Sequence, residues 1–104
     1  NMPSGVGGGE MHRLALRQNY PNPFNPVTKV AFTVPEDAGR VNLTIHNVAG
    51  RAVRTLVDSE LPAGPSLAVW DGTDDAGRSL ASGIYFARLT SREDSSFRKM
   101  TLLK

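Results

Sequence analysis

The sequence lacks several features that define whole classes of protein. Its 104 residues contain no cysteine, which excludes disulfides, cysteine-ligated metal centres and a cysteine nucleophile. Aromatic residues make up only 7% of the chain. No apolar run approaches the roughly 18 to 20 residues that a transmembrane helix needs. The net charge of +2 is too small to favour nucleic acid as a partner. These absences leave one small domain with a modest apolar core.

Residues 1–12 form a Gly-rich stretch with almost nothing to bury. Val6 is the only aliphatic residue in it, and the stretch lacks the basic, apolar and small-residue order of a signal peptide. We therefore expect a flexible linker over 1–12 and a single folded domain over 13–104. If the domain belongs to an exported protein, its export signal is expected upstream in a longer precursor or elsewhere in the sequence.

The apolar residues beyond the linker recur mainly at every second position, in short runs broken by Gly, Pro, Asn and Asp. No stretch holds the i, i+3, i+4 stripe of an amphipathic helix over three turns. The pattern predicts an all-β antiparallel sandwich of about seven strands. We place these strands at residues 13–18, 28–34, 41–46, 51–58, 66–70, 83–91 and 97–103.

Two turns are predicted from their residue types. Residues 47–50 have the chemistry of a type I turn closed by Gly50 at positive φ, and residues 71–77 form an Asp-rich turn closed by Gly77. The segment 19–26 contains three prolines, which exclude both a helix and a central strand. We interpret it as an ordered or extended crossover that closes one end of the sandwich with Tyr20 and Phe24. A recognition role for this extended segment is the alternative.

Trp70 is the only tryptophan and lies where an apolar strand meets a turn. The simplest interpretation is a core residue whose indole N–H finds a backbone acceptor. A sugar-binding role would need further coplanar aromatics, and only Tyr85 and Phe86 are candidates for them. The residues to which we assign structural roles are Tyr20, Pro23, Phe24, Gly50, Trp70, Gly77, Gly83 and Tyr85.

Three carboxylates lie in one loop, at Asp71, Asp74 and Asp75, and are candidates for calcium ligands. Their spacing is not that of an EF-hand, because Ser82 stands where a bidentate glutamate is required. Formation of the turn is therefore the favoured role for these aspartates.

The sequence shows no catalytic set. Its two histidines, His12 and His46, have no orienting acid at a suggestive spacing. We therefore expect a protein that is not an enzyme and has no cofactor.

Positive charge is concentrated in the last predicted hairpin and at the end of the sequence. These cations could dock to an acidic protein surface or an anionic polysaccharide, or they could form a solvated face that prevents edge pairing. Our candidates for partner binding are Arg88, Arg98, Lys99, Met100, Leu102, Leu103 and Lys104.

Several motifs together resemble one known family. The decapeptide NYPNPFNPVT at 19–28 is similar to the opening of the type A C-terminal sorting domains of the type IX secretion system in Bacteroidetes-like bacteria. The resemblance extends from about residue 16 to 104, although an aromatic is commoner in the family at the position of His46. The other matching stretches are 41–56, 63–64, 70–77, 81–89 and 99–104. The Trp-Asp-Gly and Ser-Gly-x-Tyr pattern also resembles the Ig-like domain of flagellar hook-capping proteins.

The resemblance implies an Ig-like sandwich at the end of a larger secreted protein, recognised during outer-membrane export and often cleaved. From it we expect a secretion and surface-sorting module located outside the cell or on its surface after passage through the periplasm. Its partners would be outer-membrane secretion and surface-attachment proteins and a covalently linked upstream cargo. One alternative is a structural Ig-like module, hook-cap-like or filament-forming, that self-associates by strand addition. Another is an accessory domain of a secreted hydrolase.

Overall fold

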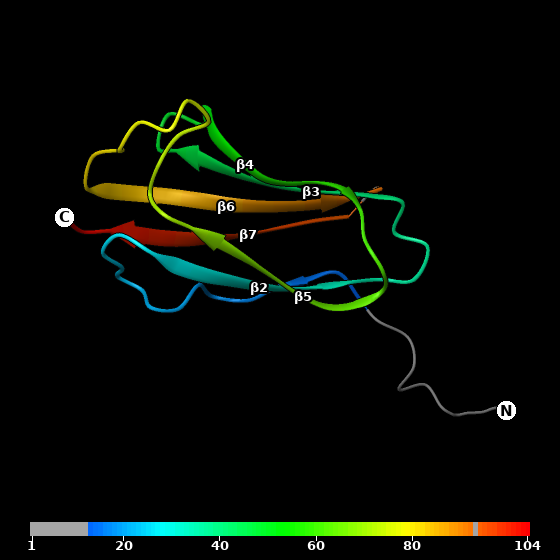
Figure 1. Ribbon diagram of the computed structural model, residues 1–104. Helices are drawn as coiled ribbons and strands as arrows, with labels where there is room; N and C mark the ends of the chain where they lie inside the picture. Colours follow the sequence, from blue (N-terminus) through cyan, green and yellow to red (C-terminus); the bar gives the residue numbers. More distant parts are fainter. Residues whose placement is uncertain (1–12, 93) are drawn as a thin grey trace, which may run out of the picture.

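The chain was analysed as a computed structural model that describes residues 13–92 and 94–104, and the predicted linker 1–12 lies outside these ranges. The described residues form an Ig-like β-sandwich, which confirms the predicted fold class. Its two sheets have the strand orders β1-β2-β5 and β4-β3-β6-β7 and lie face to face (Figure 1). The strands are β1 (Ala15–Leu16), β2 (Thr28–Val34), β3 (Arg40–Asn47), β4 (Ala52–Glu60), β5 (Gly64–Trp70), β6 (Gly83–Ser91) and β7 (Asp94–Leu102).

The core lies between the two sheets and follows the alternation of the sequence. In β2, the side chains of Val30, Phe32 and Val34 are buried while Lys29 is exposed. Period-two alternation has this result because successive side chains of a strand point to opposite faces. The buried apolar residues are Leu16, Phe24, Val30, Phe32, Val34, Ala38, Val41, Leu43, Ile45, Trp70, Tyr85, Ala87, Leu89, Met100 and Leu102.

Strand boundaries differ from the prediction mainly at the two ends of the domain. β1 has only two residues instead of the six predicted at 13–18, and beyond Leu16 only the backbones of Arg17 and Tyr20 still bond to β2 as the chain enters the Pro-rich segment. β7 begins at Asp94, earlier than predicted, because polar residues near the tip still pair with β6 in a continuous antiparallel register. Within the described residues, no helix is long and apolar enough to span a membrane.

The Pro-rich segment is ordered and runs along β7. The backbone N–H of Phe24 donates to the carbonyl of Thr101 at 3.0 Å, and the N–H of Leu103 donates to the carbonyl of Phe24 at 2.9 Å. Phe24 is 2% exposed, as expected for a residue that closes the sandwich. The corresponding prediction for Tyr20 is wrong, since Tyr20 is 79% exposed. Its backbone pairs with Lys29, and the side chain remains in solvent. Three peptide bonds of the segment are cis, those preceding Pro21, Pro23 and Pro26.

Trp70 is a core residue, as predicted. It is fully buried, and its indole N–H donates to the carbonyl of Thr73 at 2.9 Å. Its ring lies 5.4 Å from that of Phe24 and 5.5 Å from that of Tyr85, measured between centroids. The hydroxyl of Tyr85 donates to the carbonyl of Ala81 at 2.7 Å. This aromatic cluster therefore joins the Pro-rich segment, β5 and β6 at one end of the core.

Candidate docking face on the four-stranded sheet

The predicted partner-binding residues fall into three groups in the structure. Arg88 and Lys99 are exposed on β6 and β7, and Leu103 and Lys104 are exposed just after β7. The guanidinium Nε of Arg98 donates to the carbonyl of Leu16 at 2.8 Å, so this side chain covers the start of the domain. A partner-binding role does not fit Met100 and Leu102, because both side chains are fully buried in the core.

The exposed cations share a sheet face with two aromatic rings. The register aligns His46 of β3, Phe86 of β6 and Lys99 of β7 in one row across the sheet. The adjacent row contains Thr44, Arg88 and Phe97. Along β6 and along β7, a phenylalanine therefore alternates with a cation, and each phenylalanine lies opposite a cation of the other strand. We call the surface formed by His46, Val48, Phe86, Arg88, Phe97 and Lys99 the docking face.

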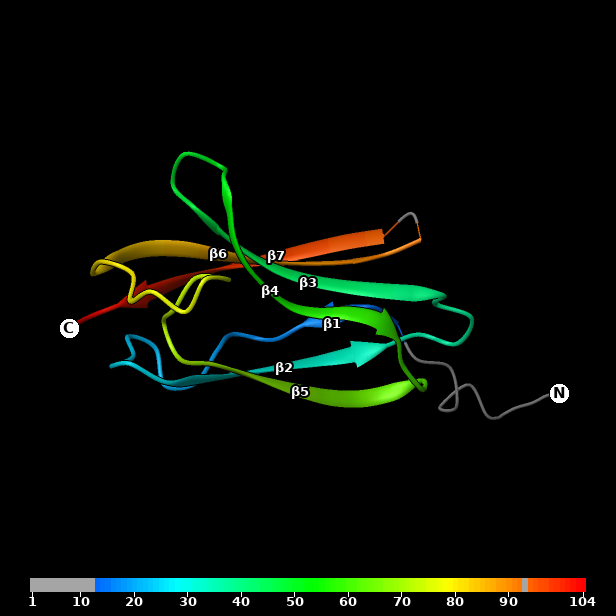
Figure 2. The same ribbon diagram turned by 45° about the horizontal axis from the view of Figure 1, so that its top comes forward.

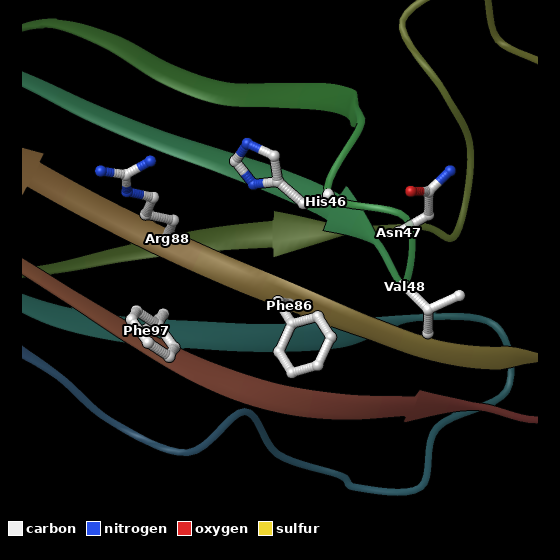
Figure 3. A pocket seen from close by; sticks show the side chains of 7 residues that line it. His46, Asn47, Val48, Phe86, Arg88 and Phe97 are labelled. Atoms are coloured by element: carbon white, nitrogen blue, oxygen red, sulfur yellow. The ribbon is translucent and has the colours of Figure 1, made fainter.

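The docking face is hollowed into a shallow groove of about 350 Å³. Phe86 and Phe97 come from adjacent strands, and His46 and Arg88 lie beside them, as Figure 3 shows. Val48, from the turn that follows β3, closes one end of the groove and is 73% exposed. Phe97 is 65% exposed, a high value for a ring of this size. A large exposed apolar group within a polar rim is typical of an interaction surface.

Three arginines outside the docking face form ion pairs. Ion pairs join Arg40 to Asp58 at 2.7 Å and Arg78 to Asp74 at 3.1 Å. Arg54 lies 3.8 Å from both Asp71 and Asp75. Among residues 13–92 and 94–104, by contrast, no ion pair involves Arg88 or Lys99. These two cations can therefore pair with carboxylates supplied by a partner.

The groups on the docking face are suited to binding. A guanidinium can bind a carboxylate through two parallel hydrogen bonds, while an ammonium acts as a compact charge with freely rotating donors. The two phenylalanine rings provide apolar area and π-faces beside these charges. The face therefore places cationic and apolar groups side by side.

The Asp-rich turn is held by its own carboxylates. Asp74 Oδ1 accepts hydrogen bonds from the backbone N–H of Ala76 at 3.0 Å and of Arg78 at 2.9 Å. The bond from the Arg78 N–H is the main reason why the pKa of Asp74 lies below its ordinary value. The hydroxyl of Thr73 is the main cause of the lowered pKa of Asp71. The predicted turn-forming role is confirmed for both carboxylates. In the part of the chain that the structure describes, no cluster of three metal-ligating side chains occurs.

Sequence reasoning did not assign Phe86, Phe97 or Val48 to a binding site. A signal was present for Phe86, because it alternates with the buried Tyr85 and Ala87 along β6. The position of Phe97 beside Arg88 depends on the register of β6 and β7. That register is a property of the assembled sheet and cannot be read from spacing within one strand.

Fold and sequence together identify the class of this domain. Residues 21–95, more than half of the chain, match the family described as the FlgD Ig-like domain. The chain therefore belongs to the FlgD Ig-like domain family. No curated protein matches the chain.

Two solved structures from Porphyromonas gingivalis contain a similar fold. One is dimeric latent PorU, with a TM-score of 0.69 and 20% identity, over 94% of this chain and 10% of PorU. The other is PorZ, an essential bacterial surface component of the type-IX secretion system, with a TM-score of 0.52 and 18% identity, over 88% of this chain and 11% of PorZ. The chain thus spans about a tenth of each protein, and the likeness is one of fold.

Proposed function

We propose that this domain is a non-catalytic sorting module of a larger exported bacterial protein, bound by outer-membrane export machinery through the docking face. The observation that carries the proposal is the combination on one sheet face of exposed Phe97 with Arg88 and Lys99, which form no ion pair with the residues that the structure describes. Membership of the FlgD Ig-like family and the fold shared with a domain-sized part of PorZ support a secretion-related role. So does the resemblance of residues 19–28 to sorting-domain motifs.

In this proposal, the folded sandwich is a handle for recognition. Arg88 and Lys99 attract an acidic partner and fix its orientation, and Phe86 and Phe97 supply the apolar contact that slows dissociation. The cargo is covalently attached upstream of the domain and takes no part in recognition. The mature protein resides on the cell surface or outside the cell after crossing the periplasm. The module requires no cofactor.

The test is an export assay in a bacterium with a working type IX system. Residues 1–104 are fused to a fluorescent cargo that carries a signal peptide, and the surface, medium and periplasm are fractionated. The informative variant is Arg88→Glu with Lys99→Glu. The matched control is Arg17→Glu with Lys29→Glu, which makes the same charge change at exposed positions outside the docking face.

We expect the wild-type and control fusions at the surface or in the medium, and the Arg88→Glu/Lys99→Glu fusion folded but retained in the periplasm. Export must also be lost in a strain without the secretion system. Equal export of all three fusions would refute a role for the docking face. Retention of the wild-type fusion in the periplasm would refute the sorting function itself.

A further inference from the structure

The edge strands of the two sheets are β1, β5, β4 and β7, and they differ in how far other segments bond to their outer backbone. At the edge of β4, the backbone N–H of Asp75 donates to the carbonyl of Val53 at 3.0 Å. The N–H of Thr55 donates to the carboxylate of Asp75, also at 3.0 Å. Two register shifts between β3 and β4 further disturb this edge. The Asp-rich turn and the irregular register therefore hinder pairing of another strand with the Val53 and Thr55 part of β4.

The C-terminal part of the β7 edge is covered by the Pro-rich segment and the residues just before it. Phe24 and Asn22 bond to the backbone of Thr101, at 3.0 Å and 2.9 Å. The side-chain amide of Gln18 donates to the carbonyl of Lys99 at 2.8 Å. β1, at the far edge of the smaller sheet, has only two residues and offers little backbone for pairing.

Within the described part of the chain, β5 is open along its whole length. All seven of its residues pair with β2 on one side. On the other side, no hydrogen bond within the described residues joins its backbone to any segment. The strand GPSLAVW carries no charge. The backbone groups of Lys29 and Ala31 bond on the β1 side of β2, so the residues of β5 whose backbone points to the open edge are Pro65, Leu67 and Val69. This edge therefore offers the N–H groups of Leu67 and Val69 and has none at Pro65. Figure 2 shows β5 along the border of its sheet. An uncharged edge of this length is a template for pairing with another strand.

The side chains of β5 also favour a partner strand. Leu67 and Val69 are 57% and 54% exposed on the outer face of the sheet. On the side of the core, Ala68 is only partly buried, as are Leu56 and Val57 of neighbouring β4. A strand added beside β5 would cover apolar surface on both faces at once.

We infer that the open edge of β5 pairs antiparallel with β5 of a second copy of this chain. A two-fold axis then joins two three-stranded sheets into one continuous sheet and brings Leu67 and Val69 of both copies together on its outer face. A second copy fits this edge because it offers the same exposed Leu67 and Val69 to the outer face, and because the uncharged strand places no like charges opposite each other when it pairs with itself. The contact is isologous, so association ends at the dimer. This inference is independent of the proposed sorting function, because β5 lies outside the docking face.

The dimer is expected to be weak. Pairing of two seven-residue strands buries less surface than the roughly 1,200 to 2,000 Å² of a stable protein interface. Association should therefore increase between low micromolar and near-millimolar protein, and it should protect the amides of Leu67 and Val69 from hydrogen exchange as concentration rises.

The test is sedimentation equilibrium of the full chain together with hydrogen exchange at several concentrations. Leu67→Lys puts a charge at the pairing edge and should weaken dimerisation by about tenfold or more. Phe97→Lys is the matched control, because it places the same charge at a similarly exposed apolar position on the other sheet. Val69→Lys is the second variant at the edge, and it decides the test if Leu67→Lys does not fold.

We expect the wild type and Phe97→Lys to dimerise equally and the two edge variants to remain monomeric but folded. Concentration-dependent protection should appear in β5 of the wild type. A wild type that stays monomeric throughout, a dimer insensitive to the edge variants, or one weakened as much by Phe97→Lys would overturn the inference. Association that continues beyond the dimer would overturn the two-fold arrangement.

Discussion

Replacement of Phe24 by alanine tests whether the Pro-rich segment is part of the core. Phe24 is the one residue of 20–26 that is both apolar and buried, and its ring packs against that of Trp70 at 5.4 Å. The segment has few other apolar contacts that could hold it against β7. Phe24→Ala should therefore loosen the whole segment as well as leave a cavity.

The size of the effect follows from burial. A buried phenylalanine truncated to alanine costs about 3 to 5 kcal/mol in the free energy of unfolding. The complete stability of a domain of this kind is about 5 to 15 kcal/mol. At about 4 to 8 °C per kcal/mol, the melting temperature should fall by about 12 °C or more. Phe97→Ala is the control, because Phe97 is 65% exposed and its truncation should cost no more than about 0.5 kcal/mol.

Urea and thermal denaturation of both variants give the comparison. Trp70 is the only tryptophan, so its fluorescence reports unfolding of the core, and far-UV circular dichroism provides a second probe that does not depend on contact with Phe24. A loss below about 1 kcal/mol for Phe24→Ala, or equal losses for the two variants, would refute the placement of Phe24 in the core.

Two further predictions concern the Asp-rich turn. Gly77 has a φ of +83° and open space around it, so Gly77→Val should cost about 1 to 2 kcal/mol in urea denaturation and Gly77→Asn less. Equal costs would contradict backbone strain as the cause. The lowered pKa of Asp74 means that its contribution to stability is complete above the ordinary value of 3.8 and is lost as pH falls through the lowered native value. Asp74→Asn should therefore flatten the loss of stability below about pH 4, and an unchanged slope would argue against this linkage.

The sequence was most informative where one strand has one buried face. In β2 and β3, alternation correctly predicted Val30, Phe32 and Val34 and then Val41 and Ile45 as core residues. The reason is direct, because in a strand the sequence position determines the face and the face determines burial.

Prediction of buried residues failed in the Pro-rich segment, where the alternation of a β-strand does not apply. Tyr20 and Phe24 are both aromatic and lie between prolines, and nothing local distinguishes the buried ring from the exposed one. The choice is made by a long-range contact, the hydrogen bonds of Phe24 with Thr101 and Leu103. Which aromatic ring of the Pro-rich segment is buried can therefore be decided only when the fold is known.

The candidate site was predicted in part. Arg88 and Lys99 were selected for their charge, and both lie on the docking face. Met100 and Leu102 were grouped with them because they share the last strand, although alternation with the exposed Lys99 assigns them to the opposite, buried face. The contribution of Phe97 could not be predicted, because it depends on the strand register between β6 and β7.

The bonds between the Pro-rich segment and β7 also determine when the domain can fold. Met100 and Leu102 complete the core, and Phe24 pairs with the same strand, so the beginning and the end of the sandwich stabilise each other. A chain from which β7 has not yet emerged, at the ribosome or at a membrane pore, has an open core and an unpaired edge on β6. In such a chain, the entropy lost on closing long loops is not offset by the contacts that β7 makes in the folded domain. We therefore expect the domain to complete its folding only after β7 has arrived.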